Sequence, residues 1–119
     1  MTSNGTDIYN VKSLQVVENH LDAVLHIPTD LIYFDGHFDE MSVLPGVVQV
    51  HWAIEMAKEH FKISSDFSAI EVLKFMRVIQ PDEIVNLQME YDDSKKVMNF
   101  TYKSSPEITH SKGKVKFSA

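Results

Sequence analysis

One stretch decides the predicted fold: Phe34–Phe61, which reads FDGHFDEMSVLPGVVQVHWAIEMAKEHF. Its first part, Phe34–Pro45, contains a glycine and ends in proline, which predicts an irregular loop. Its second part, Gly46–Phe61, predicts a helix because its apolar residues recur three or four positions apart. The predicted buried stripe consists of Val47, Val50, Ile54, Ala57 and Phe61, widened by Val48 and Trp52. Since the first three turns are mostly apolar, we expect other parts of the chain to wrap this helix.

Composition limits the classes of protein to which the chain can belong. A length of 119 residues, with 44% hydrophobic and 24% charged residues, predicts one soluble globular domain. No apolar run reaches the roughly 18 residues of a membrane-spanning helix, and the first residues lack the pattern of a signal peptide. We therefore expect a cytoplasmic protein without a membrane span. The net charge of −6 argues against general binding of nucleic acid, and the absence of cysteine excludes a disulfide or a thiol nucleophile.

On either side of the helix the sequence predicts strands. Leu21–Pro28 alternates apolar and polar residues, as a half-buried strand does, and Ser64-Ser65-Asp66 ends the helix before further strands follow. The expected strands are Val11–Glu18, Leu21–Pro28, Phe67–Ile79, Ile84–Tyr91, Val97–Lys103 and Ile108–Phe117. Residues 1–7 are expected to be frayed. The chain is thus expected to be an α+β domain, in which one helix can cover the sheet only if the sheet curls around it.

Several motifs resemble those of the beta-hydroxyacyl-carrier-protein dehydratases. They are Phe34-x-Gly36-His37-Phe38, Val43-Leu44-Pro45-Gly46-Val47, Lys74-Phe75-x-Arg77, Pro81-Asp82 and Gly113–Phe117. Within that superfamily, Leu44–Ala53 most resembles the dehydratase-like proteins of aryl-polyene lipid clusters. The resemblance runs from roughly Val11 to the end of the chain. It implies a single hotdog-fold domain over residues 1–119, with one long central helix wrapped by a curled antiparallel sheet.

The resemblance also implies a reaction and the residues that perform it. The reaction is dehydration of a 3-hydroxyacyl thioester, linked to acyl carrier protein or coenzyme A, to the trans-2-enoyl thioester in fatty-acid or aryl-polyene-type lipid synthesis. His37 takes the place of the base that removes a proton from C2. Gly46 and Val47 present the N–H groups of the helix start to the thioester carbonyl. No cofactor or metal is implied. Because the family's acid comes from the partner subunit, the expected unit is a homodimer or a higher oligomer of dimers.

The acid position departs from the family's pattern. Where the family has Glu or Asp, this chain has His51. An imidazolium donates a proton as a carboxylic acid does, and imidazoles titrate near neutral pH, so a two-histidine site can still dehydrate. Glu55, one helical turn further on, can orient that imidazole or replace the missing carboxylate. Asp39 and Ser42 stand where the family commonly has proline, and they make the loop less rigid.

Each of these residues also has a plainer interpretation. Taken alone, a histidine such as His51 on an apolar helix face is more often a core residue than a catalytic one, and Glu55 can be solvated or structural. Gln49 and Trp52 are expected to serve packing or dimer contact, each with a polar tip that needs a partner. A metal held by His37, His51 and Glu55 is not expected, since the family uses none. The other histidines follow no metal-ligand spacing: His20, His26, His60 and His110.

The sequence leaves two other functions open. The change at His51 admits a hotdog thioesterase, or a non-catalytic subunit that binds acyl carrier protein. A thioesterase would release free thiol from acyl thioesters that lack a 3-hydroxyl group, whereas a binding subunit would turn nothing over. Candidate cations for docking an acidic carrier protein are Lys74, Arg77, Lys112, Lys114 and Lys116. The residues that can line an acyl tunnel, or simply fill the core, are Phe75, Met76, Ile79, Met89 and Met98.

Overall fold

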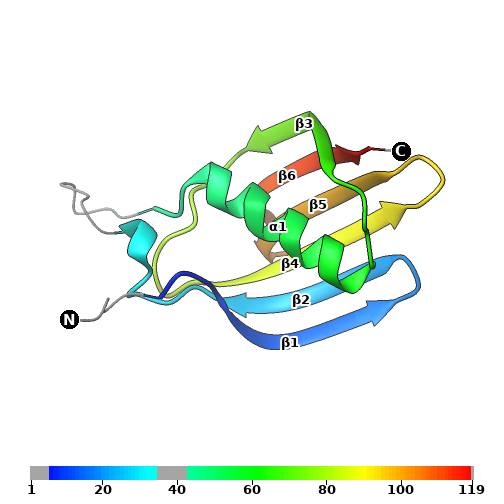
Figure 1. The fold of residues 1–119 in the computed structure, drawn as a ribbon. Coiled ribbons are helices and arrows are strands. Elements are labelled where there is room, and N and C mark those ends of the chain that lie inside the picture. The colour runs from blue at the N-terminus through cyan, green and yellow to red at the C-terminus, as the bar shows by residue number, and fades with distance from the viewer. Residues whose placement is uncertain (1–5, 35–42, 119) are drawn as a thin grey trace, which may run out of the picture.

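The computed structural model describes residues 6–34 and 43–118. Its elements, in chain order, are β1 (Asn10–Val17), β2 (His20–His26), the 3-10 helix η1 (Ile32–Phe34), α1 (Gly46–His60), β3 (Phe67–Phe75), β4 (Ile84–Asp92), β5 (Val97–Ser105) and β6 (Ile108–Phe117). Within the described residues, six strands form one sheet in the order β1-β2-β4-β5-β6-β3, and neighbouring strands run antiparallel. The helix α1 lies against one face of this sheet (Figure 1). The predicted α+β architecture, one helix wrapped by a curled antiparallel sheet, is confirmed.

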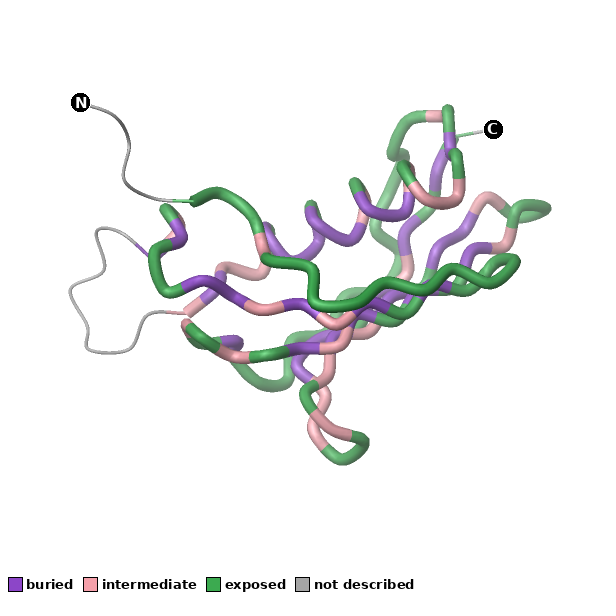
Figure 2. Tube along the Cα trace, turned by 90° about the horizontal axis from the view of Figure 1, so that it is seen from below, coloured by how far each residue is buried: buried purple, intermediate pink, exposed green. Residues whose placement is uncertain are grey.

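The core lies between α1 and the inner face of the sheet. Buried side chains alternate with more exposed ones along β4, and in β5 the buried residues are Val97, Met98, Phe100 and Tyr102. Figure 2 shows these buried positions along the helix and the central strands. The buried residues of α1 include Val48, Val50, Trp52, Ala53, Met56 and Ala57, and those of the sheet include Leu87, Met98, Phe100, Tyr102, Val115 and Phe117.

The helix begins at Gly46, as predicted, and ends at His60, one residue before its predicted end. The predicted buried stripe is wrong at Val47, whose side chain is 75% exposed. The reason is helical geometry. The buried face is centred on Ala53 and Ala57, both fully buried, and Val47 lies about 120° around the helix from Ala53. The start of the helix is therefore less enclosed than its apolar sequence suggested.

The strand β3 is shorter than predicted and is bulged at two places, between Phe67 and Ala69 and between Ile70 and Val72. The prediction carried it to Ile79, but the strand ends at Phe75. The N–H groups of Met76 and Arg77 both donate to the carbonyl of His110, at 2.9 and 3.1 Å, instead of continuing the ladder. Residues 76–79, which we call the strap, run from this point towards the start of α1.

Most other element boundaries lie close to the predicted ones. β6 has the predicted ends, whereas β1 and β2 each begin one residue early, with a turn at Glu18 and Asn19. The 3-10 helix η1 was not predicted. The chain start also differs from the expected frayed segment, because the N–H of Thr6 donates to the carbonyl of Asp30 and its own carbonyl accepts from Ile32. Residues 1–5 of that segment lie outside the described residues.

Candidate functional site

Among the described residues, no side chain caps the backbone N–H groups at the start of α1. The carbonyl of Pro45 accepts hydrogen bonds from the N–H groups of Val48 and Gln49, at 3.1 and 3.2 Å. Gly46 and Val47 precede these donors, and the first N–H groups of a helix have no acceptor within it. Together with the helix dipole, such groups can stabilise negative charge on a carbonyl oxygen. The role predicted for Gly46 and Val47 needs this kind of helix start, and stays a prediction.

A cavity of about 340 Å³ opens beside the helix start. It is lined on one side by residues 43–46 and Gln49, and on the other by Phe75 and residues 76–78 of the strap. The ring of Phe75 lies directly against Gly46, so a Cβ at this position would clash with the ring. Glycine thus permits the close approach of ring and helix. Arg77 adds a positive charge to the lining of this cavity.

His51 and Glu55 lie on the exposed side of α1, one turn apart, and both line a cleft of about 600 Å³. The interpretation of His51 as a core histidine is therefore wrong, because the core lies on the other side of the helix. Tyr9 and Tyr33 line the same cleft, and their rings pack edge-on against buried Trp52, with ring centroids 5.0 and 6.3 Å away. Burial, and then the charge of Glu59, raise the pKa of Tyr9.

The structure brings some of the predicted site residues together and separates others. His51 and Glu55 share one cleft, whereas Gly46 lines the cavity on the strap side. Val47 projects into solvent. His37, with the loop residues Asp39 and Ser42, lies outside the described residues. The predicted pairing of His37 with His51 stays a prediction.

The sequence required a partner for the polar tip of Gln49, and the structure supplies two. This side chain is 3% exposed and donates from Nε2 to the carbonyl of Leu44 at 3.2 Å. Its Oε1 accepts from the hydroxyl of Ser111 at 2.7 Å, and its backbone carbonyl accepts from the hydroxyl of Tyr102 at 2.7 Å. Burial raises the pKa of Tyr102 well above the usual tyrosine value. No motif in the sequence indicated that Ser111 and Tyr102 would bond to Gln49, because both lie far from Gln49 along the chain.

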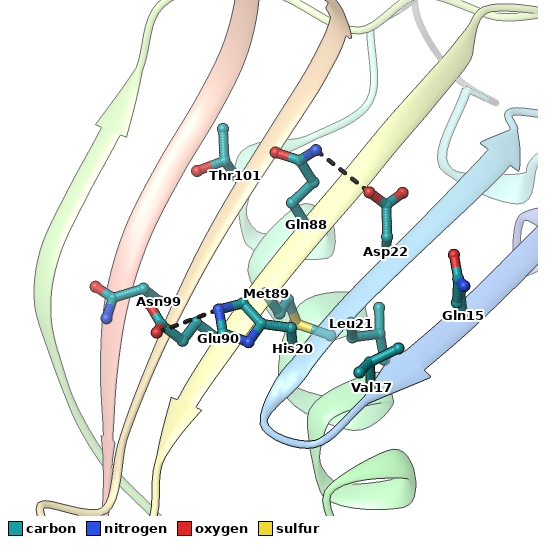
Figure 3. A pocket seen from close by; sticks show the side chains of 10 residues that line it. All are labelled: Gln15, Val17, His20, Leu21, Asp22, Gln88, Met89, Glu90, Asn99 and Thr101. Atoms are coloured by element: carbon teal, nitrogen blue, oxygen red, sulfur yellow. Dashed lines mark hydrogen bonds and ion pairs between the residues drawn. The ribbon is translucent and has the colours of Figure 1, made fainter.

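A further pocket, of about 420 Å³, lies on the outer face of the sheet, away from α1 (Figure 3). Its polar side chains pair with one another: His20 lies 3.3 Å from Glu90, and Gln88 donates to Asp22 at 3.4 Å. These residues alternate with buried ones on β2 and β4. The pocket holds none of the predicted site residues, and its lining is that of a solvated sheet face.

The lysines proposed for docking fall on neighbouring strands. Lys74 of β3 pairs directly with Lys112 of β6, and Lys112, Lys114 and Lys116 alternate with buried residues. Lys114 lies 3.9 Å from Glu71. In the part of the chain that the structure describes, no group of three or more His, Cys, Asp or Glu side chains could hold a metal ion. No described helix is long and apolar enough to cross a membrane.

Comparisons with known proteins point to one family. A model of the ApeI-like family, described as ApeI dehydratase, matches residues 13–114. The 3-hydroxyacyl-[acyl-carrier-protein] dehydratase FabZ of Ruminiclostridium cellulolyticum is 29% identical over 80 residues, which cover 61% of this chain and 56% of that enzyme. The match therefore spans little more than half the length of this curated relative.

Two solved structures share nearly the whole fold. The dehydratase heterocomplex ApeI:P from Xenorhabdus doucetiae gives a TM-score of 0.87 at 27% identity, covering 94% of this chain and 99% of that one. An uncharacterised protein from Erwinia carotovora subsp. atroseptica gives 0.82 at 26% identity, covering 93% and 96%. Because the family model spans most of the chain, this hotdog protein belongs to the ApeI-like dehydratase family.

Proposed function

We propose that this protein dehydrates 3-hydroxyacyl thioesters to trans-2-enoyl thioesters. Family membership supports hydroxyacyl dehydration in general. The observation that carries the proposal is the arrangement on α1. An uncapped helix start is followed, at the family's acid position, by a histidine that opens to a cleft rather than to the core. A proton donor at this place can reach a bound substrate, which a buried histidine could not.

The proposed chemistry divides the elimination among three groups. His37 removes the proton from C2, and the N–H groups of Gly46 and Val47 bind the thioester oxygen on which negative charge then develops. In the dimer, the imidazolium of His51 from the other subunit gives its proton to the C3 hydroxyl group, which leaves as water while the double bond forms between C2 and C3. Glu55, one turn away on the same face, orients the imidazole of His51. Afterwards His37 holds the proton from C2, and transfer to His51 restores the starting state.

The substrate proposed is the thioester of acyl carrier protein or of coenzyme A, in fatty-acid or aryl-polyene-type lipid synthesis. The name of the FabZ relative specifies a carrier-protein substrate for that enzyme. In this chain, Lys74, Lys112 and Arg77 supply cations near the end of β3. Complementary charge of this kind speeds the encounter with an acidic partner. Their role in docking stays a prediction.

We propose a homodimer, joined at β3, as the smallest functional unit. β3 forms one edge of the sheet, and all nine of its residues are exposed. A free edge strand offers unpaired N–H and C=O groups to a second strand. Its exposed apolar residues are Phe67, Ile70, Val72, Leu73 and Phe75. A second copy seated on this edge would also lie close to the helix start, because Phe75 touches Gly46.

The deciding experiment measures turnover of 3-hydroxyacyl thioesters, and the reverse hydration of the enoyl product, from pH 5.5 to 8.5. The wild type is compared with His37→Ala, His51→Ala, His51→Glu and Glu55→Gln. We expect each of the two alanine variants to lose about 10²-fold or more in kcat/KM, the usual contribution of a general acid or base. Glu55→Gln is expected to lose less activity than either alanine variant, because Glu55 only orients the acid.

Other results of these measurements would favour a different acid or a different function. Unchanged turnover in His51→Ala would show that another group donates the proton. Dehydratase activity that appears only in His51→Glu would mean that the native protein no longer catalyses dehydration. Release of free thiol from an acyl thioester without a 3-hydroxyl group would favour the thioesterase. Binding of acyl carrier protein with no turnover, and unchanged by His37→Ala, would favour the non-catalytic subunit.

A further inference from the structure

A buried chain of hydrogen bonds joins the start of α1 to β6. The amide of Gln49 donates from Nε2 to the carbonyl of Leu44 and accepts at Oε1 from the hydroxyl of Ser111, which is fully buried. This orientation of the amide is required, because the carbonyl oxygen of Leu44 can only accept. Gln49 therefore connects the residue just before Pro45 and Gly46 to the sheet.

The preceding residue of β6, His110, holds the strap. Its carbonyl accepts from Met76 and Arg77, and its Nδ1 lies 3.1 Å from the carbonyl oxygen of Val78. A carbonyl only accepts, so this nitrogen carries a proton and donates it. The His110 side chain is 1% exposed, and its Nε2 lies 3.6 Å from a carboxylate oxygen of Glu83. His110 thus fixes the strap through both its backbone and its ring.

A bulge in β6 explains how two adjacent residues can both be buried. The pairing register passes from Tyr102 with Ser111 to Lys103 with Thr109, which leaves His110 as the extra residue. Without the bulge, neighbouring side chains would point to opposite faces of the sheet. Bulges commonly re-aim a side chain next to a functional site. Here the bulge turns His110 and Ser111 inward together, one towards the strap and the other towards the helix start.

A backbone hydrogen bond joins the two sides of the 340 Å³ cavity. The N–H of Leu44 donates to the carbonyl of Ile79 at 2.8 Å, and so joins the segment before α1 to the strap. Gln49 holds the carbonyl of the same Leu44. A continuous series of hydrogen bonds therefore runs from Ser111 through Gln49 to Leu44, two residues before the helix start.

We propose that Gln49 and Ser111 are positioning residues. Through the carbonyl of Leu44 they set the distance between the helix start and the strap, and hence the direction of the N–H groups of Gly46 and Val47. Their catalytic meaning rests on the proposed dehydration, in which these N–H groups bind the developing oxyanion. A small change in their direction would weaken binding of the transition state more than binding of the substrate.

The test combines amide hydrogen exchange with kinetics in Ser111→Ala, Gln49→Leu and the double variant. Ser118→Ala is the matched control, because the hydroxyl of Ser118 also donates a hydrogen bond, to the backbone carbonyl of Asp66, but lies exposed, beyond the end of β6. We expect the Leu44 amide to exchange about tenfold faster in Ser111→Ala, while amides of β4 and β5 keep their protection. The kcat for dehydration should fall about tenfold with KM within about twofold. Ser118→Ala should change neither.

The double variant tests whether the two residues act through one chain. Because the side-chain hydrogen bonds that join Ser111 to Leu44 run through Gln49, adding Ser111→Ala to Gln49→Leu should leave the exchange of Leu44 unchanged. Additive effects, or wild-type exchange of Leu44 in Ser111→Ala, would overturn the inference. A wild type without dehydratase turnover would refute the proposed function, but the exchange of Leu44 would still decide whether Gln49 and Ser111 hold the helix start.

Discussion

Two glycines that face phenylalanine rings give a matched test of packing at the residue scale. A Cβ on Gly46 would meet the ring of Phe75, which is 51% exposed and has room to swing away. A Cβ on Gly113 would lie 2.5 Å from the ring of Phe100, 1% exposed, and 3.1 Å from a backbone carbonyl. We expect Gly113→Ala to lower the free energy of unfolding by about 1–3 kcal/mol, and Gly46→Ala by less than about 0.5 kcal/mol. Urea unfolding measures both, and equal losses would contradict this account.

At the same scale, local motifs identified the residues but not their surroundings. The Pro45-Gly46 pair predicted the helix start, and the motif placed His51 at the family's acid position. The burial of His51 was open on sequence alone, because the width of the apolar stripe left its orientation undecided. The hydrogen-bond partner of the Gln49 side chain could not be predicted from the sequence, for another reason. Ser111 lies 62 residues further along the chain, and the sheet order and a bulge bring it to the helix.

At the scale of the elements, Tyr102 fastens α1 to β5. Its buried hydroxyl donates to the carbonyl of Gln49, and burial raises the pKa of Tyr102 well above the usual value of 10.0. Near neutral pH, Tyr102→Phe should cost about 1 kcal/mol of unfolding free energy. Above pH 10 the unfolded chain loses this proton first, so Tyr102 contributes less stability as pH rises. The wild type should then lose its advantage over Tyr102→Phe by up to about 1.4 kcal/mol per pH unit.

Denaturant unfolding from pH 7 to 11 follows this difference between wild type and Tyr102→Phe. Other tyrosines titrate in both proteins, so the difference isolates Tyr102. A gap that stays constant above pH 10 would contradict the assignment of a buried, protonated hydroxyl.

The predicted ends of helices and strands agree with the structure where the nearby sequence determines them. β6 has its predicted ends, and α1 differs by one residue. The predicted strand was longer than β3 because the apolar sequence continues through Ile79. In the structure the strand ends at Phe75, and the N–H groups of the next two residues donate to the carbonyl of His110. That acceptor is more than thirty residues away, so no local pattern could locate the end of the strand. For the same reason, the strap and its contact with Leu44 were absent from the prediction.

At the scale of the whole molecule, neither composition nor periodicity indicated the order of the strands in the sheet. β3 pairs with β6 although β4 follows it in the chain. The sequence around β3 lacks the clean alternation of β4, and carries apolar residues at both even and odd positions. Such a run is typical of a strand buried on both faces. In this structure the strand is exposed throughout, and we propose that a second copy of the chain covers it.

The last prediction concerns the proposed dimer. It is tested by replacing exposed apolar residues with glutamate on one edge strand of the sheet at a time. Ile70 and Val72 on β3 are each 42% exposed, while Val11 and Val17 on the opposite edge strand β1 are 53% and 56% exposed. The double variant Ile70→Glu, Val72→Glu would place unpaired charges in the proposed interface, and should raise the dimer Kd by about 100-fold or more. The matched variant Val11→Glu, Val17→Glu should leave the dimer intact. Light scattering coupled to size-exclusion chromatography measures the mass of each, with circular dichroism to check folding. A monomeric wild type would refute the dimer, and dissociation by the β1 variant alone would place the interface at the other edge.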